Sequence, residues 1–307
     1  MQLAKRLKAV KPSPTLSLNA KARALAAKGA DVLSFAAGEP DFDTPAHIKD
    51  AIKAALDGGF TKYTATGGIP ELKTAIVEKL AQENQLTFAP EQVVVTVGGK
   101  QALYNAFQAM LSPGDEVIIF SPYWVSYPDM VRLADGEPVI VETSAADNWV
   151  PDPKALRKAL SPRTKAVIFN SPSNPSGAVI PKDALIALAN ELRGHDCVLI
   201  TDDIYERLLY VDGPFFSIAN VGPEFAARTL VVNGFSKAFS MTGLRLGYAA
   251  GPKDLIAGMQ MIQDQSTSNA TSVIQKGAVA ALKGPRGPID EMVKVFAQRR
   301  ISTWRIA

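Results

Sequence analysis

The chain contains 307 residues, of which 47% are apolar and 21% are charged, and its formal net charge at pH 7 is +3. This length can bury one large hydrophobic core and part of a second, and the composition is ordinary for a soluble protein. A net charge this small gives no argument for nucleic-acid binding. No apolar run could span a membrane and no signal peptide opens the chain, so we expect a cytoplasmic protein.

Cysteine and histidine are scarce. The single cysteine, Cys197, lies in an apolar run, which excludes a disulfide framework and predicts a buried, unreactive thiol. His47 and His195 together with one cysteine make no metal-ligand cluster, so we expect no metal.

The start of the chain is basic, with seven Lys and Arg residues before the first acid, Asp31. An acid-free basic start can be a mitochondrial transit peptide. Here the segment continues without interruption into a patterned helix and strand. We therefore interpret it as a structural arm whose cations could meet an acidic substrate.

The first elements after the arm are bounded by glycine and proline. We expect a helix over residues 19–28 that Gly29 ends, a strand over residues 32–35, and a helix with Pro45 at its first position that ends at Gly58. A longer helix is expected over residues 71–84.

From there on, strands alternate with helices. Short apolar or β-branched runs occur at residues 93–97, 117–120, 139–142, 166–169, 198–201 and 230–232. This alternation predicts an α/β domain with a largely parallel sheet that helices cover on both faces. Ligands of such sheets bind beyond the carboxyl ends of the strands, so the residues directly after each run are the candidates for a site.

The run at residues 230–232 leads to a lysine, Lys237, and eight residues later to Arg245 between two glycines. Lysine forms Schiff bases with carbonyl compounds, and pyridoxal phosphate is the cofactor that uses this bond. A solvated surface lysine beside an unrelated arginine is the alternative that this segment leaves open.

Other strand ends carry further candidates. Gly99 and Lys100 begin a helix directly after a strand, which favours anion binding, whereas dinucleotide and nucleoside triphosphate fingerprints are absent. Trp124 could stack on a flat ligand or belong to the core. Asn174 lies in an irregular turn, and Asp202 ends a buried strand, where an acid needs a cation or several donors; a pyridinium N–H would meet it.

Taken together, these residues resemble the class I and II aminotransferases, which have the aspartate aminotransferase fold (fold type I), and most closely their bacterial aspartate/prephenate subgroup. The matching motifs stand in family order at residues 37–42, 62–64, 98–103, 122–128, 174–177, 202–205 and 236–243. The resemblance runs from about Lys11 to Arg300.

The resemblance implies roles at the cofactor, pyridoxal 5'-phosphate. Lys237 would form the Schiff base and move the proton between the substrate Cα and the cofactor C4′. Asp202 would pair with the pyridine nitrogen, Tyr205 and Asn174 with the 3′-oxygen, and Trp124 would stack on the ring. The phosphate site would comprise Arg245, Gly99, Lys100, Gln101 and Ser236, together with Tyr63 of a neighbouring subunit, which implies a homodimer.

The resemblance also implies a substrate class. Gly38 and Asn174 match positions near the α-carboxylate, and Trp124 is also expected to contact the substrate. Lys100 and Lys11 match positions near a distal carboxylate, although Lys11 could equally be a solvated arm residue. The expected reaction is transamination between aspartate or glutamate and a 2-oxo acid such as 2-oxoglutarate, with prephenate as a further acceptor. A carbon–sulfur lyase or synthase of the same fold, or a cofactor-binding protein with little activity, remains an alternative.

The end of the chain departs from the family. The family continues into a further small-domain segment with an arginine that clamps the α-carboxylate, and no residue here matches it. The helix pattern is also expected to stop after Arg300. We therefore expect an arm with part of a small domain at residues 1–40, a large cofactor-binding domain at 41–285, and the start of a truncated small domain at 286–307.

Overall fold

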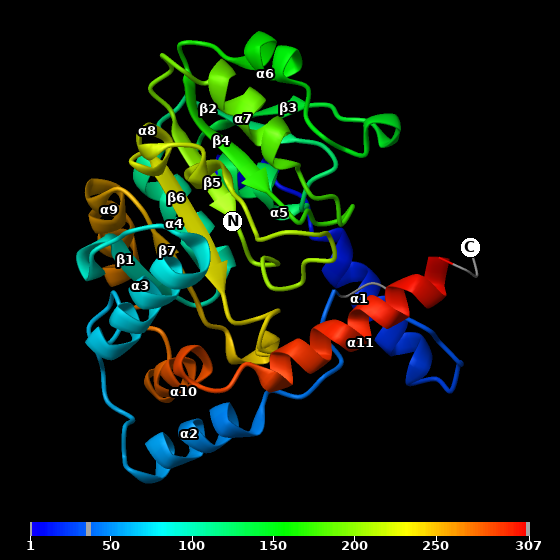
Figure 1. Cartoon of the computed structure of the whole chain (residues 1–307), viewed down its shortest axis with the longest axis vertical. Helices are drawn as coiled ribbons and strands as arrows, with labels where there is room; N and C mark the ends of the chain where they lie inside the picture. Colours follow the sequence, from blue (N-terminus) through cyan, green and yellow to red (C-terminus); the bar gives the residue numbers. More distant parts are fainter. Residues whose placement is uncertain (1, 35–37, 305–307) are drawn as a thin grey trace.

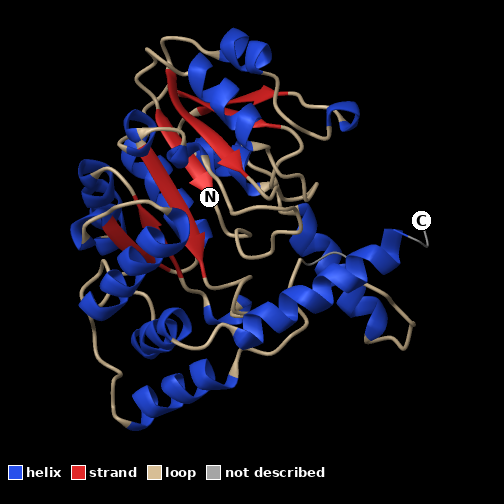
Figure 2. Ribbon diagram, in the orientation of Figure 1, coloured by secondary structure: helices blue, strands red, loops and turns tan. Residues whose placement is uncertain are grey.

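A computed structural model describes residues 2–34 and 38–304 of the chain. A seven-stranded sheet lies at the centre of this part (Figures 1 and 2), with the strand order β1-β7-β6-β5-β4-β2-β3. The strands are β1 (Val93–Thr96), β2 (Glu116–Phe120), β3 (Glu137–Val141), β4 (Thr164–Asn170), β5 (Val198–Asp202), β6 (Thr229–Gly234) and β7 (Gly247–Ala250). β7 pairs antiparallel with β1 and β6, and the other pairs are parallel.

Helices cover both faces of the sheet, so its central strands are buried on both sides. Side chains alternate between the faces: Val231 belongs to one core cluster, and its neighbours Leu230 and Val232 belong to another. The second cluster also contains side chains of α4 (Gly99–Met110), α5 (Ser126–Leu133) and α9 (Lys253–Asp264). Three layers therefore form the core.

The opposite face has two core clusters side by side along the sheet. Beside β1, β7 and β6 the helices are α3 (Pro70–Asn84), α10 (Ser272–Lys283), α2 (Ala46–Asp57) and the start of α11 (Gly287–Trp304). Beside β2, β4 and β5 they are α6 (Pro153–Ala159), α7 (Lys182–Glu191) and α8 (Pro223–Ala226). α3 thus lies on the face opposite α4, beside β6, the strand that Lys237 follows.

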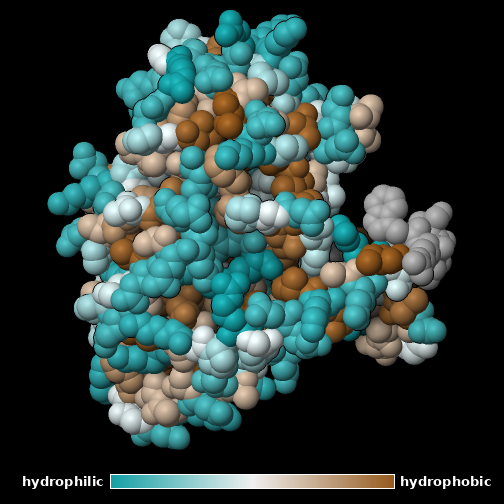
Figure 3. Space-filling model, viewed as in Figure 1, coloured by the Kyte–Doolittle hydropathy of each residue, from teal (hydrophilic) through white to brown (hydrophobic). Residues whose placement is uncertain are grey.

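α1 (Pro14–Ala26) and most of α11 lie outside these layers (Figure 1). α11 is joined to the segment before α2, because Arg299 donates to both carboxylate oxygens of Asp41 at 2.7 and 2.9 Å. Apolar side chains stay exposed on both helices, including Leu18 at 56% and Ile301 at 51%. Apolar surface is visible around the end of α11 in Figure 3.

The predicted fold class is confirmed, but several elements differ from the prediction. The strand expected at residues 32–35 is wrong for residues 32–34, which pair with no strand of the sheet; Leu33 is 85% exposed, and Phe35 lies outside the described residues. The helix expected at residues 19–28 instead runs from Pro14 to Ala26. Pro45 is the N-cap of α2 rather than its first residue.

The last helix continues to Trp304, so the expected loss of helix after Arg300 is wrong for residues 301–304; residues 305–307 lie outside the described residues. β7 was not predicted, because Gly-Tyr-Ala-Ala has no β-branched residue, and its pairing with two neighbours makes it a strand. None of the helices formed by the described residues combines the length and the apolar character needed to cross a membrane.

Candidate active site

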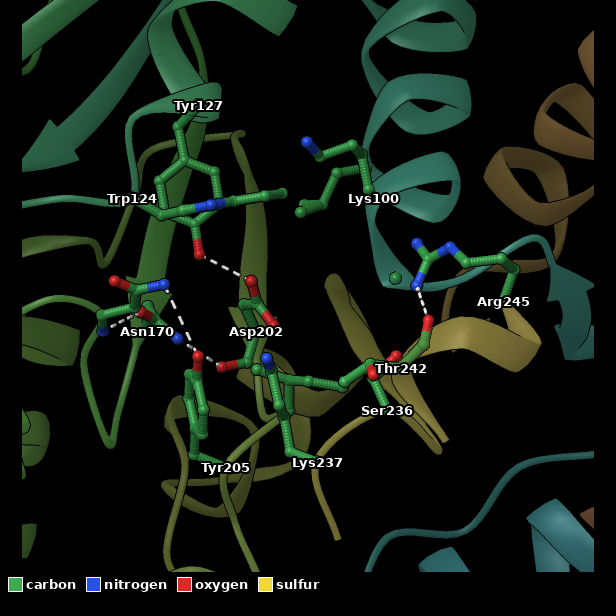
Figure 4. Close-up of a pocket in the computed structure, with 14 residues that line it drawn as sticks. Lys100, Trp124, Tyr127, Asn170, Asp202, Tyr205, Ser236, Lys237, Thr242 and Arg245 are labelled. Atoms are coloured by element: carbon green, nitrogen blue, oxygen red, sulfur yellow. Dashed lines mark hydrogen bonds between the residues drawn. The ribbon is translucent and has the colours of Figure 1, made fainter. Parts of the chain in front are cut away.

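A cavity of about 270 Å³ opens at the carboxyl ends of β4, β5 and β6 (Figure 4). The following residues line it: Gly99, Lys100, Leu103, Trp124, Tyr127, Asn170, Asn174, Asp202, Ile204, Tyr205, Ser236, Lys237, Thr242 and Arg245. Most of the residues predicted from the strand ends are therefore brought together at one edge of the sheet.

Lys237 reaches the cavity from the turn that follows β6 and is partly buried. Its Nζ donates a hydrogen bond to the carbonyl of Gly38 and lies 6.0 Å from the centroid of the Tyr205 ring. Burial lowers the pKa of the Lys237 amine; Glu39 opposes this shift and Arg245 adds to it. A lowered pKa increases the fraction of neutral amine, which is the nucleophilic form.

Asp202 ends β5 and is only 7% exposed. Tyr127 donates its hydroxyl to Asp202 Oδ2 at 2.6 Å. Burial raises the pKa of Asp202 to about 6, although the Tyr127 hydroxyl and the backbone N–H of Ile204 act in the opposite direction. These partners are neutral donors, so the carboxylate retains a strong preference for a cation that enters the cavity.

Two aromatic side chains form the wall beside Asp202. Trp124 and Tyr127 meet edge to face, with ring centroids 5.3 Å apart and an interplanar angle of 88°. Lys100 Nζ lies 4.8 Å from the centroid of the Trp124 ring. Burial lowers the pKa of Lys100, and Arg245 lowers it further. The wall therefore combines a flat apolar surface with a positive edge.

The opposite wall carries Tyr205 and Asn174, whose hydroxyl and Nδ2 are 3.5 Å apart. Asn170 holds this wall: its Oδ1 accepts from the backbone N–H of Asn174 at 2.8 Å, and its Nδ2 donates to the carbonyl of Asp202 at 2.9 Å. Burial, followed by the charge of Asp202, raises the pKa of Tyr205 to about 12 against the effect of Asn174. Tyr205 therefore keeps its proton and can donate it in a hydrogen bond to an anionic oxygen.

The third side of the cavity is suited to an anion. Gly98 has φ +82°, and a Cβ there would lie 2.6 Å from Arg245 Nη2. A Cβ at Gly247 would lie 2.4 Å from the backbone nitrogen of Gly99, which begins α4. Glycine at 98 thus permits the close approach of the Arg245 guanidinium, and glycine at 247 permits the close approach of β7 to the N-terminus of α4. The guanidinium and the helix N-terminus both attract phosphate.

Four predicted site residues do not line this cavity, and two of them line a neighbouring one. Lys11 and Gln101 line a neighbouring cavity of about 540 Å³, which shares Lys100 and Arg245 with the first. The Gln101 side chain is used within the fold: Oε1 accepts from the Val97 N–H at 2.5 Å, and Nε2 donates to Thr267 at 2.5 Å.

The other two residues outside the lining are Tyr63 and Gly38. Tyr63 is 92% exposed, and Gly38 meets the cavity only through the bond that Lys237 donates to its carbonyl. Tyr127 and Asn170, in contrast, line the cavity and were not predicted. Tyr127 stands three positions after Trp124, about one helical turn, and this spacing could have identified it.

The sequence profile of class I and II aminotransferases matches residues 30–303. The chain belongs to this family. The aspartate/prephenate aminotransferase of Thermus thermophilus is 53% identical over 301 residues, which cover 97% of this chain and 77% of that protein. The aspartate aminotransferase of Geobacillus stearothermophilus is 49% identical, with 97% of this chain and 76% of that protein covered.

Solved aminotransferase structures have the same fold. The aspartate aminotransferase from Thermus thermophilus with maleate has a TM-score of 0.90 and 49% identity, covering 99% of this chain and 78% of that chain. The aspartate aminotransferase from Rhizobium meliloti has a TM-score of 0.94 and 44% identity, covering 98% of this chain and 75% of that chain. The resemblance predicted from the motifs is therefore confirmed.

Class I and II aminotransferases use pyridoxal phosphate, and the cavity of this chain has the features to hold it. A buried acid with neutral partners suits a protonated pyridine nitrogen, and the glycines beside Arg245 suit a phosphate. The Lys237 amine, with its lowered pKa, suits an aldehyde. The three chemical features of the cofactor thus each have a matching group in the cavity.

Proposed function

We propose that this aminotransferase exchanges an amino group between aspartate or glutamate and a 2-oxo acid such as 2-oxoglutarate, and that it also accepts prephenate. One observation carries the proposal: a lysine with a lowered pKa and a buried acid, whose partners in the described part of the chain are neutral donors, line the same cavity. The third side of this cavity is suited to phosphate. The relatives named aspartate and aspartate/prephenate aminotransferases support the choice of substrates.

In the proposed mechanism the cofactor, when bound, supplies an electron sink for the electron pair left as the substrate Cα loses its proton. The Lys237 amine would move that proton between the substrate Cα and the cofactor C4′. Its half-buried position supports this role, because a neutral amine can accept a proton at neutral pH. Asp202 would keep the pyridine nitrogen protonated, and Tyr205 and Asn174 would donate hydrogen bonds to the 3′-oxygen.

The phosphate end is assigned to Arg245, the backbone of Gly99 and Lys100, and Ser236. Gln101 contributes by holding the turn before α4, since its side chain bonds Val97 and Thr267. Trp124 would cover the cofactor ring and one side of the substrate. The flat wall formed with Tyr127 supports this assignment and excludes water from the reacting Cα.

Substrate carboxylates are assigned to two groups of residues. The α-carboxylate would lie near Gly38 and Asn174, next to the Lys237 amine. The distal carboxylate would meet Lys100 and Lys11, which line the neighbouring cavity together. A dicarboxylic substrate that extends from one cavity into the other would explain the preference for aspartate and glutamate.

A homodimer is part of the proposal, with Tyr63 reaching the phosphate of the other subunit. Support comes from the loop that carries Tyr63. Gln275 Nε2 donates to Thr64 Oγ1 at 3.1 Å, and Gln263 Nε2 donates to the carbonyl of Thr66 at 2.9 Å. An aromatic side chain that is 92% exposed on a loop held in this way is suited to a contact with a second copy. The cytoplasmic location and the division at residues 41 and 286 remain predictions.

The test uses protein loaded with pyridoxal phosphate. The visible band of the bound cofactor should disappear when aspartate is added and return when 2-oxoglutarate is added, with oxaloacetate and glutamate as products. A band that aspartate leaves unchanged would contradict transamination and favour a binding protein with little activity. Release of pyruvate and ammonia without a 2-oxo acid would favour a lyase of the same fold.

A further inference from the structure

We propose that the buried ion pair between Lys79 and Glu206 positions Tyr205 for its hydrogen bond to the cofactor, by tying the turn that carries Tyr205 to the end of α3. The inference rests on the proposed function, because Tyr205 is the donor to the 3′-oxygen there. Lys79 and Glu206 touch neither substrate nor cofactor and are positioning residues.

The ion pair closes a three-membered network. The Glu206 carboxylate accepts from Lys79 Nζ and, at 2.7 Å, from Asn84 Nδ2, and Lys79 Nζ also donates to Asn84 Oδ1 at 2.8 Å. The Lys79 and Glu206 side chains are only 5% and 8% exposed. Burial pushes the pKa of Glu206 up, but the charge of Lys79 and the bonds from Asn84 and Lys79 outweigh it and leave the pKa lowered. Glu206 therefore stays charged beside its cation.

The network acts on the turn that starts at the end of β5. Tyr205 and Glu206 are adjacent, and the turn is closed by the bonds from Glu206 N to Asp203 O at 3.0 Å and from Leu208 N to Tyr205 O at 2.8 Å. Tyr205 projects into the cavity (Figure 4), whereas Glu206 faces α3. Any movement of the Glu206 backbone therefore also moves Tyr205.

A second tie joins the same turn to α3. Arg207 donates from Nη2 to both carboxylate oxygens of Glu83, at 2.7 and 2.9 Å, and its guanidinium lies 4.9 Å from the centroid of the Phe239 ring. Phe239 is two residues after Lys237. The end of α3 thus holds the turn with Tyr205 directly and contacts the turn with Lys237 through Arg207.

Stability alone is a poor explanation for a buried ion pair. Removing two charges from water costs several kcal/mol, and apolar residues of similar volume often stabilise a fold as well or better. A reacting group, in contrast, needs its donor held within about 0.5 Å of the productive position. Among the described residues, the Tyr205 hydroxyl has one hydrogen-bond partner, Asn174 at 3.5 Å, and Lys237 Nζ lies 6.0 Å from its ring centroid. The network behind Tyr205 is therefore the stronger constraint on its position.

The experiment compares Glu206→Gln, alone and together with Tyr205→Phe, in the protein loaded with pyridoxal phosphate. The pH midpoint of the visible cofactor band reports the proton affinity that the Tyr205 bond lowers. The charge of Asp202 acts on Tyr205, Lys237 Nζ lies 6.0 Å from its ring centroid, and the buried acid Asp203 interacts with both Glu206 and Lys79. Glu206→Gln should raise this affinity roughly threefold to tenfold, and should add nothing when Tyr205→Phe is already present.

The matched control is Glu71→Gln, which removes the partner of Lys276 at the other end of α3. That pair, at 2.8 Å, is largely exposed, and Glu71→Gln should leave the midpoint unchanged. A double variant, Lys79→Met with Glu206→Met, removes the pair without leaving a buried charge unpaired. This variant should fold even if Glu206→Gln does not, and should show the same raised proton affinity.

Amide hydrogen exchange of residues 203–208 in the cofactor-free protein gives a second readout. Exchange there should be at least about tenfold faster in Glu206→Gln than in the parent, with no change in Glu71→Gln. An unchanged midpoint, or an equal shift in the Tyr205→Phe background, would overturn the inference. If the parent protein binds no pyridoxal phosphate, the proposed function fails. Unchanged amide exchange at residues 203–208 in Glu206→Gln would then also contradict the positioning role of the Lys79–Glu206 pair.

Discussion

The carboxyl edge of the sheet and the amino-terminal arm both carry predicted site residues, but they are built very differently. Asp202, at the sheet edge, is 7% exposed and bonded to Tyr127. Among the described side chains of residues 2–34, none is buried. The cofactor groups are therefore held by the core of the fold, whereas Lys11 depends on few contacts. Cofactor binding should tolerate changes in the arm, and changes at the sheet edge should abolish function.

The largest effect is expected from Lys237→Ala. Without the Lys237 amine, the cavity loses the group assigned to bond the aldehyde and to move the proton at Cα, so transamination should fall by about 10²- to 10⁴-fold. Activity with aspartate and 2-oxoglutarate, and borohydride trapping of the cofactor, measure the change. Lys165→Ala, on the exposed surface of β4, is the matched control and should retain both. Borohydride trapping of the cofactor at full yield in Lys237→Ala would disprove that Lys237 bonds the aldehyde.

Asp202→Asn tests how much the burial of the Asp202 carboxylate lowers the stability of the cofactor-free protein. The folded pKa is raised from 3.8 to about 6, so the folded cofactor-free protein binds this proton more tightly than the unfolded chain does. Its stability therefore falls as pH rises from about 4 to about 6, and the whole penalty is present above that range. At about 1.4 kcal/mol per pKa unit, Asp202→Asn should gain on the order of 3 kcal/mol at pH 8.

Urea unfolding of the cofactor-free protein at pH 5 and pH 8 measures this gain. The gain should be larger at pH 8 than at pH 5, and the same variant should lose transamination because the pyridine nitrogen no longer faces an acid. Asp135→Asn, at an exposed position, is the control and should change neither property. Equal stability of Asp202→Asn and the parent at pH 8 would contradict the expected cost of burying the Asp202 carboxylate.

Arg245→Ala should weaken the cofactor rather than remove the chemistry. Charge-assisted hydrogen bonds contribute about 1.5–3 kcal/mol each, so the dissociation constant for pyridoxal phosphate should rise by roughly 10- to 150-fold. Fluorescence titration of the cofactor-free protein measures it, and pyridoxal without phosphate should bind the variant and the parent alike. Arg157→Ala, which breaks an exposed ion pair with Glu191, should bind as the parent does.

The smallest effect is expected in the arm. Lys11→Ala removes one exposed cation from the neighbouring cavity, and exposed charge pairs contribute about 0.2–1 kcal/mol. KM for aspartate should rise by at most about fivefold, less so at high salt, with an unchanged dissociation constant for the cofactor. Lys8→Ala, also in the arm but outside that cavity, is the control. A large loss of cofactor affinity in Lys11→Ala would contradict the claim that cofactor binding depends on the sheet edge and not on the arm.

Residues that end a regular strand were predictable, and residues that depend on packing were not. Lys237, Asp202 and Asn174 follow apolar runs, and parallel strands bring such positions to one edge. The strand expected at residues 32–35 failed because an apolar run becomes a strand only where a neighbouring strand accepts its hydrogen bonds, and residues 32–34 have none. β7 forms a strand although none of its residues is β-branched, because β1 and β6 both pair with it.

The sequence by itself determined the alternation of strands and helices, the positions of the reactive lysine and the buried acid, and the family. These features depend on local patterns and on the geometry that every parallel sheet shares. The tertiary structure alone decided that Tyr127 meets Asp202, that the Gln101 side chain bonds Val97 and Thr267, and that the Lys79–Glu206 pair joins the turn that carries Tyr205 to α3. Each of these depends on the packing of segments far apart in the chain, where distance and burial set the pKa and the orientation of a side chain.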